Sequence, residues 1–229
     1  MRFAMLSYSR CCDFYRCPYL FQCHDEVVLD TPAIRLGTQI DTLLNILMMK
    51  HMAPELRHKK AVELGVSEML QKIVDSGDIC DMFKVPPMVK SWYVDFVSSG
   101  LQVVDCQRHF VLEDLDYHGY IDGIVTDGTS TWVIENKTTS RYYDKFFTSK
   151  KNSYQAVGYA LATGTDLVKY QFFDTHSMAA YTPVSRIVTK EDIEEFKEWV
   201  NHVRNNSSCF VKNKEWCSLN ECPIKEECW

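Results

Sequence analysis

The sequence lacks the features that mark several protein classes. It has no apolar run of about eighteen residues, so we expect no transmembrane helix. The start of the chain becomes polar too early for a signal peptide, which makes a cytoplasmic protein the expectation. The chain also has no internal repeat, no low-complexity tract and no glycine-rich phosphate loop, so it encodes no ATP-driven motor.

An excess of positive charge is also missing. The 25 lysines and arginines are outnumbered by 31 aspartates and glutamates, which gives a formal net charge of −6. This balance disfavours a nucleic-acid-binding protein that depends on bulk positive charge. It does not exclude a nuclease, because carboxylates that hold a metal ion add negative charge and the ion offsets that charge locally.

The composition is sufficient for one folded domain with a core. Hydrophobic residues make up 46% of the 229 residues, so we do not expect disorder. We predict a single domain over residues 1–229, with a helical insert at about 52–99 and a cysteine-rich segment at about 209–229.

Hydrophobic periodicity predicts helices first, then strands, a helix, strands and a last helix. This order is typical of an α/β domain with a mixed central sheet and helices on its faces. The predicted helices cover residues 7–24, 32–51, 55–99 (with a break at Pro86-Pro87), 155–161 and 190–203, and the predicted strands cover 101–113, 167–173 and 181–188.

A β-hairpin is predicted in the middle of the chain. The apolar runs 119–125 and 132–137 flank an Asp127-Gly128 turn signal. Side chains alternate along a strand, so Glu135 and Lys137 should point the same way, and the hairpin can place Asp122 beside Glu135.

Two carboxylates and an ammonium would then converge on one patch. Such a patch suits a hard cation such as magnesium, with Lys137 beside it. The alternative is a half-buried strand whose charged residues face water. Gln155 and Tyr159 favour a site, because they are four residues apart on one face of the helix that follows.

These residues resemble the PD-(D/E)XK nuclease superfamily and, within it, the RecB-like exonuclease branch. The resemblance lies in three ordered elements: G-x-x-D at Gly119–Asp122, E-x-K at Glu135–Lys137, and Q-x-x-x-Y at Gln155–Tyr159. A restriction-endonuclease-like core is implied. Gly37–Asp41 is similar to the family's G-T-x-x-H segment, with Asp41 in place of the histidine.

The resemblance also implies roles for individual residues. Asp122 and Glu135 would hold magnesium or manganese, with the backbone carbonyl of Asn136 as a further oxygen ligand. Asp41 would complete the ligand set, although a solvated helix residue is the alternative. Lys137 would orient water and stabilise developing negative charge, and the Gln155 and Tyr159 side chains would position the scissile strand.

A basic stretch follows the predicted hairpin. It interleaves aromatic residues with Arg141, Lys145, Lys150 and Lys151. We interpret it as a loop that contacts phosphates at the mouth of the site, with aromatic rings available to stack on bases. An ordinary solvated loop is the alternative.

Ten cysteines are many for a chain in a reducing compartment, where metal binding accounts for a cysteine cluster better than disulfides do. The N-terminal segment L-S-x-S…F-x-x-C-P-x-x-F and three late cysteines resemble the iron–sulfur members of the RecB-like branch. That resemblance implies a four-iron, four-sulfur cluster that joins both ends of the chain. Its ligands would be Cys17, Cys217, Cys222 and Cys228.

Alternatives to this cluster remain open from the residues. Four residues separate Cys217 from Cys222 where the family often has two, and Cys209 could replace one ligand. A four-cysteine zinc site or plain buried thiols would also account for these cysteines. Cys12 and Cys23 flank the N-terminal ligand and are minor alternatives to it. The cluster's expected role is structural, because it would close a loop of about 200 residues, with redox sensing as the alternative.

The predicted function is a Mg²⁺- or Mn²⁺-dependent deoxyribonuclease, most simply an exonuclease acting on DNA ends or single strands. The rivals are a structure-specific endonuclease on the same core and a non-cleaving DNA- or protein-binding module with a four-cysteine metal site. Family habit places such a nuclease in a prokaryote or a phage-infected cell. A homo-oligomer or a recombination or helicase partner is compatible with it.

Overall fold

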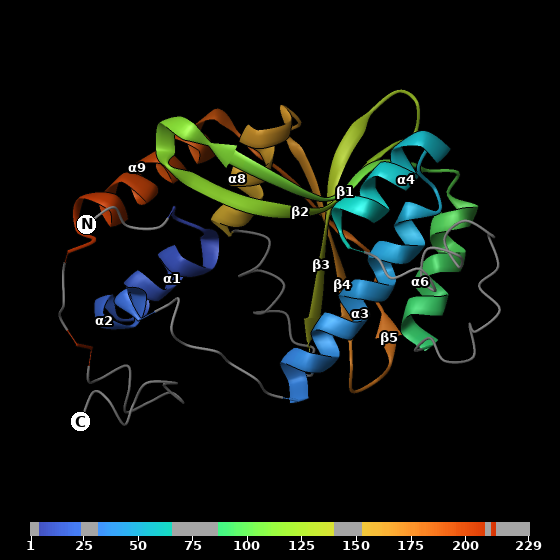
Figure 1. Ribbon diagram of the computed structural model, residues 1–229, viewed down its shortest axis with the longest axis horizontal. Helices are drawn as coiled ribbons and strands as arrows, with labels where there is room; N and C mark the ends of the chain where they lie inside the picture. Colours follow the sequence, from blue (N-terminus) through green and yellow to red (C-terminus); the bar gives the residue numbers. More distant parts are fainter. Residues whose placement is uncertain (1–4, 24–31, 66–86, 140–152, 209–211, 214–229) are drawn as a thin grey trace.

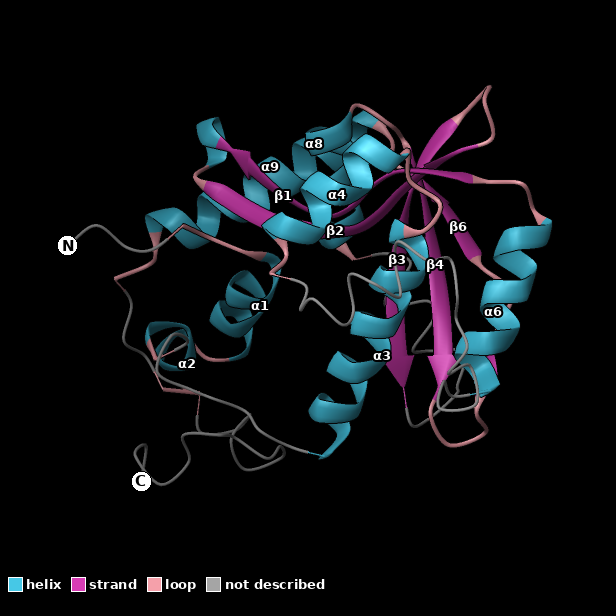
Figure 2. Ribbon diagram, turned by 45° about the vertical axis from the view of Figure 1, so that its right-hand side comes forward, coloured by secondary structure: helices cyan, strands magenta, loops and turns pink. Residues whose placement is uncertain are grey.

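The computed structural model of the protein describes residues 5–23, 32–65, 87–139, 153–208 and 212–213 (Figure 1). These residues form an α/β fold in which helices cover both faces of a six-stranded mixed sheet (Figure 2). None of the helices described is both long and apolar enough to cross a membrane. The predicted fold class is therefore confirmed for this part of the chain.

The sheet has the order β1-β2-β3-β4-β5, with β6 also paired to β4. Among the described strands the β3–β4 pair is parallel, and β1–β2, β2–β3, β4–β5 and β4–β6 are antiparallel. The strands are β1 (Gln102–Leu112), β2 (Tyr117–Thr126), β3 (Thr131–Thr139), β4 (Leu167–Asp174), β5 (Ala179–Ala180) and β6 (Val184–Ile187).

The described helices divide between the two faces of the sheet. Those that pack with the first core are α1 (Tyr8–Arg16), α2 (Pro18–Gln22), α8 (Tyr154–Thr163) and α9 (Lys190–Asn205). Those that pack with the second are α3 (Pro32–Met49), α4 (Pro54–Glu63) and α6 (Pro87–Ser98). A short 3₁₀ helix, η1 (Glu113–Leu115), joins β1 to β2.

Each core follows from the alternation of side chains along the strands. On β3, Val133 belongs to the first core and Trp132 and Ile134 belong to the second. Phe196 of α9 is fully buried in the first core, where its ring meets that of Tyr117 edge-on at 5.1 Å. The central strands are therefore buried on both faces, as expected for a sheet between two helical layers.

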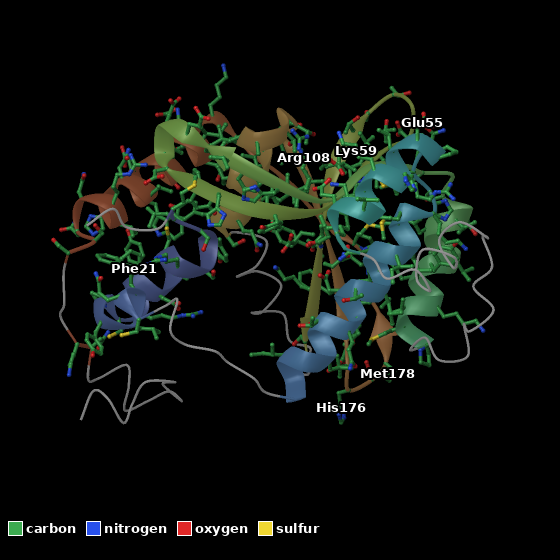
Figure 3. All side chains as sticks on the ribbon, in the orientation of Figure 1. Phe21, Glu55, Lys59, Arg108, His176 and Met178 are labelled. Atoms are coloured by element: carbon green, nitrogen blue, oxygen red, sulfur yellow. The ribbon has the colours of Figure 1, made fainter. Side chains whose placement is uncertain are left out.

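One predicted helix, residues 7–24, is instead two helices with a break at Cys17. Cys17 has extended backbone angles, φ −162° and ψ 114°. The cause is Pro18, because a proline disfavours the helical conformation of the residue before it and is favourable as the first residue of the next helix. Phe21 of α2, which is labelled in Figure 3, then packs edge-on against Phe14 of α1.

The strand predicted at 181–188 is also shorter than expected. Its ladder with β4 begins only at Val184, directly after Pro183. Proline has no backbone N–H to donate, which is consistent with a strand that begins after it. The other predicted elements in the described ranges are confirmed to within a few residues, including the β2–β3 hairpin and the helix that carries Gln155.

The packing of Phe196 gives a test of the first core. We expect Phe196→Ala to lower the free energy of unfolding by about 3–5 kcal/mol, because it removes a fully buried ring and leaves a cavity. Val94→Ala, at a side chain that is 52% exposed on α6, should change it by less than about 0.5 kcal/mol. Urea unfolding of both variants measures the difference, and equal losses would contradict this description of the core.

Candidate active site

The site is built where strands β2 and β3 separate. Their ladder runs from Thr126↔Thr131 to Gly123↔Ile134 and stops there. Beyond this end, Asp122 is the next residue on β2, and the backbone N–H of Asn136, two residues past Ile134 on β3, donates to Asp122 Oδ2 at 2.7 Å. The carboxylate of Asp122 thus replaces a backbone acceptor at this fork and holds the two strands together where the ladder ends.

The other oxygen of Asp122 connects it to β1 and α3. Gln107 Nε2 lies 3.3 Å from Asp122 Oδ1 and 3.2 Å from Asn45 Oδ1, and Asn45 Nδ2 lies 3.4 Å from Asp41 Oδ2. A chain of amides therefore links the two aspartates. Gln107 has a positive φ of 45°, a conformation uncommon outside glycine and frequently found at functional positions.

Glu135 is buried, with 2% of its surface exposed, and its two oxygens have different partners. Lys137 Nζ forms an ion pair with Oε1. The Tyr159 hydroxyl donates to Oε2 at 2.7 Å, and Gln155 Nε2 donates to that hydroxyl oxygen at 2.6 Å. Glu135 and Lys137 therefore point the same way, as predicted, and Gln155 and Tyr159 share a helix face, as predicted. Their contacts form one network that fixes the glutamate.

Three carboxylates line one cavity of about 260 Å³. Asp41 reaches it from α3, Asp122 from β2 and Glu135 from β3, and Lys137, Gln155 and Tyr159 also line it. Burial and the nearby Glu135 and Asp41 charges raise the pKa of Asp122 well above its ordinary value. Burial and Glu135 likewise raise the pKa of Asp41.

Lys137 is the cation that faces these acids. Burial alone would lower its pKa, but the Glu135 and Asp122 carboxylates outweigh burial, so the pKa of Lys137 is raised and its ammonium form is favoured. The hydroxyl of Tyr159 also has a pKa well above its ordinary value, because it is buried beside Glu135, so it remains a donor.

The donor chemistry of this cavity fits a hard divalent cation. In the described residues no three His, Cys, Asp or Glu side chains form a ready-made metal cage. Asp122 and Glu135 are bonded instead to donors of the protein. The set is nevertheless all oxygen, as magnesium and manganese prefer. Oδ1 of Asn136 and Oε1 of Gln155 are buried acceptors without a hydrogen-bond partner.

A second cavity, of about 490 Å³, adjoins the first. Tyr120, Lys137, Gln155 and Tyr159 line both of them. The far wall of the second cavity includes Ser7, Tyr8 and Ser9, at the start of α1. The acidic cavity therefore opens toward a larger hollow between the β1–β2 hairpin and the N-terminal segment.

Several predicted site residues lie outside the described residues. These are the basic residues Arg141, Lys145, Lys150 and Lys151 and the late cysteines Cys217, Cys222 and Cys228. Cys17 is described: it is fully buried, and the Asn213 backbone N–H lies 3.4 Å from its sulfur. Sequence reasoning missed Gln107 and Asn45, since neutral amides carry no motif and their meeting depends on the fold.

A sequence model of the PD-(D/E)XK nuclease superfamily matches residues 5–228. Because this match spans nearly the whole chain, the protein belongs to the PD-(D/E)XK nuclease superfamily. No curated protein sequence matches the chain.

Solved structures with some likeness are an alkaline exonuclease, LHK-Exo, from Laribacter hongkongensis, and a protein described as SSO0001. LHK-Exo is 14% identical, with a TM-score of 0.43 over 95% of this chain and 92% of that chain. Its complex with dAMP is 13% identical, with a TM-score of 0.40 over the same shares. SSO0001 is 12% identical, with a TM-score of 0.32 over 59% of this chain and 70% of that chain.

The raised pKa of Asp122 gives a test of the electrostatics. A carboxyl whose pKa rises on folding lowers the stability of the fold progressively as the pH rises above its unfolded pKa, and this cost disappears as the pH falls to that value. In chelator at neutral pH, Asp122→Asn should therefore raise the melting temperature, by about 2–6 °C. The gain should shrink as the pH is lowered toward about 4, the ordinary pKa of an aspartate.

Asp127→Asn is the matched control. Asp127 accepts backbone N–H bonds from Thr129 and Ser130, which lower its pKa, so its charged form favours folding. Its amide variant should not raise the melting temperature. A neutral-pH melting temperature for Asp122→Asn at or below the wild-type value would contradict the electrostatic description of the site.

Proposed function

We propose that this protein is a Mg²⁺- or Mn²⁺-dependent deoxyribonuclease that acts as an exonuclease on DNA ends or single strands. The observation that carries the proposal is the fork between β2 and β3, where Asp122, Glu135 and Lys137 line one cavity. Membership of the nuclease superfamily supports the same activity.

The proposed metal ligands are the oxygens of Asp41, Asp122, Glu135 and the Asn136 backbone carbonyl. A bound divalent cation would supply Lewis-acid stabilisation of the phosphate and lower the pKa of a water molecule. The carboxylate oxygens that line the cavity are chemically suited to hold such an ion.

The protein's own groups have separable roles in this proposal. Lys137 keeps a positive charge beside the acids and stabilises negative charge that develops on the phosphate oxygens. The hydroxyl of Tyr159 holds Glu135 in one orientation, and Gln155 in turn holds that hydroxyl. Gln155 also lines both cavities, which places it beside the proposed path of the scissile strand.

Cleavage assays separate this function from its rivals. With linear DNA and Mg²⁺ or Mn²⁺, we expect degradation that Glu135→Ala abolishes, and that Lys137→Ala lowers by about 10²- to 10³-fold, as for the loss of one stabilising charge. Lys197→Ala, at an exposed lysine paired with Glu194 on α9, is the matched control and should be fully active.

Two outcomes of this assay would contradict the proposal. No degradation by the wild-type protein in either metal would favour the binding-module rival. Efficient cutting of covalently closed circular single strands would favour the endonuclease rival.

We also propose that Cys17, Cys217, Cys222 and Cys228 hold a four-iron, four-sulfur cluster. Cys17 is buried at the α1–α2 break, and the Asn213 backbone lies against its sulfur, while Asn213 Nδ2 donates to the Arg16 carbonyl at 2.9 Å. Cys217 follows Asn213 by four residues, a span of up to about 14 Å, so it can reach the same place.

A further contact near Cys17 fits a cluster that joins the two ends of the chain. Gln22 of α2 donates to the Ser207 carbonyl, so the segment after α9 lies against the N-terminal helices at a second point. A cluster here would close nearly the whole chain into a loop and stabilise the single proposed domain.

The proposed helical insert at 52–99 contains helices α4 and α6, and both of them pack on α3.

Visible absorption and metal analysis of anaerobically purified protein test the cluster. We expect a brown protein with about four irons, and we expect Cys17→Ala to lose the iron. Cys106→Ala is the control, because Cys106 lies in the second core beside Met52 and should leave the iron content unchanged. A colourless protein with one zinc would instead support the four-cysteine zinc site.

A further inference from the structure

Strand β2 has an open edge beside the proposed cleavage site. Leu6 bridges to Tyr117 at one end of this edge, and the ladder to β3 begins at Gly123 at the other end. Between these points, in the described residues, Gly119–Ile121 pair only with β1. Figures 1 and 2 show the β1–β2 hairpin extending from the sheet above α1.

One face of this stretch carries aromatic side chains in line with Asp122. Alternation along a strand places His118, Tyr120 and Asp122 on the same side of β2. Tyr120 lines both the acidic cavity and the larger cavity next to it, and His118 lines the larger one. A ligand that extends from the carboxylates along β2 therefore meets Tyr120 first and His118 next.

His109 of β1 completes a continuous group of rings, which we term the hairpin ridge (His109, His118 and Tyr120). His109 is the cross-strand partner of Tyr120, and their ring centroids are 4.8 Å apart. His109 Nε2 and His118 Nδ1 lie 3.3 Å apart, within hydrogen-bonding distance. The three rings thus support one another, as cross-strand aromatic pairs do.

Two of the three side chains of the ridge are exposed and the third, His118, is half-buried. Tyr120 keeps 56% of its surface exposed and His109 is also exposed, whereas the neighbouring Phe110 and Tyr117 are buried in the first core. None of the three side chains carries a negative charge that would repel a phosphate backbone. Exposed rings beside a phosphodiester site suit a nucleobase, since every base has a flat face that stacks on an aromatic ring.

The geometry points to an unpaired DNA strand as the occupant. Bases in the interior of a duplex already stack on one another and present only their edges in the grooves, so successive bases can cover rings along β2 only after leaving the stack. We propose that the hairpin ridge is a stacking platform for the nucleobases next to the scissile phosphate and gives the protein a preference for unpaired DNA. This inference rests on the proposed nuclease function and names its substrate class.

The test is a cycle between protein variants and abasic substrates. Single-stranded oligonucleotides with one abasic position, moved stepwise from the cleaved end, are compared with the intact strand. With the intact strand, Tyr120→Ala should lower kcat/KM by roughly tenfold or more, and Tyr120→Phe should retain most of the activity because it keeps the ring. At one abasic position the Tyr120→Ala loss should disappear, since the base that stacks there is missing.

Tyr15→Ala is the matched control. Tyr15 is 51% exposed, but it lies on α1 with its ring stacked on Trp199, away from both cavities. It should leave kcat/KM unchanged on every strand. Blunt duplex DNA should be a poorer substrate than the unpaired strand and should respond little to Tyr120→Ala.

Two outcomes would overturn the inference. One is a Tyr120→Ala loss that persists at every abasic position, because a structural defect does not depend on one base. The other is a duplex that is cleaved as well as the single strand with the same sensitivity. If the wild-type protein cleaves no DNA, the nuclease proposal fails. The same variants and oligonucleotides are then compared by binding affinity. Equal affinities of the wild type and Tyr120→Ala would overturn the stacking platform separately.

Discussion

The hydrogen bond from the Asn136 backbone to the Asp122 carboxylate is the contact on which the rest of the site depends. It occurs where the β2–β3 ladder ends, so the strands diverge without leaving the Asn136 N–H unsatisfied. The divergence creates the space that the carboxylates line, and it exposes the edge of β2 that carries Tyr120. One buried acceptor thus connects the fold to the cavity and the cavity to the proposed DNA path.

The same arrangement keeps like charges close together in the protein without a bound metal ion. Asp41, Asp122 and Glu135 approach one another in a buried place, and the protein relieves part of the repulsion with Lys137, Tyr159 and the amides. In the proposed function a divalent cation would offset this repulsion, so the site would sacrifice stability for function. The positions of the acids are set by three separate elements, α3, β2 and β3, each of which is anchored in a core.

The sequence predicted the order of the elements, the hairpin and the helix that carries Gln155 and Tyr159 on one face, because these depend on local periodicity and turn chemistry. It did not predict the end of the ladder at Gly123, since strand pairing beyond a turn is decided by long-range packing. The contact of Gln107 with Asn45 could not be predicted either, because it joins β1 to α3, which are far apart in the sequence. The break at Cys17, by contrast, follows from Pro18 alone and was open to prediction.

Manganese binding measured by electron paramagnetic resonance tests the central claim most directly. We predict that the wild-type protein binds Mn²⁺ specifically and that Asp122→Ala and Glu135→Ala each lose this binding while their circular dichroism spectra remain those of a folded protein. Undiminished Mn²⁺ binding in both variants would place the metal elsewhere and would contradict the assignment of the β2–β3 fork as the catalytic centre.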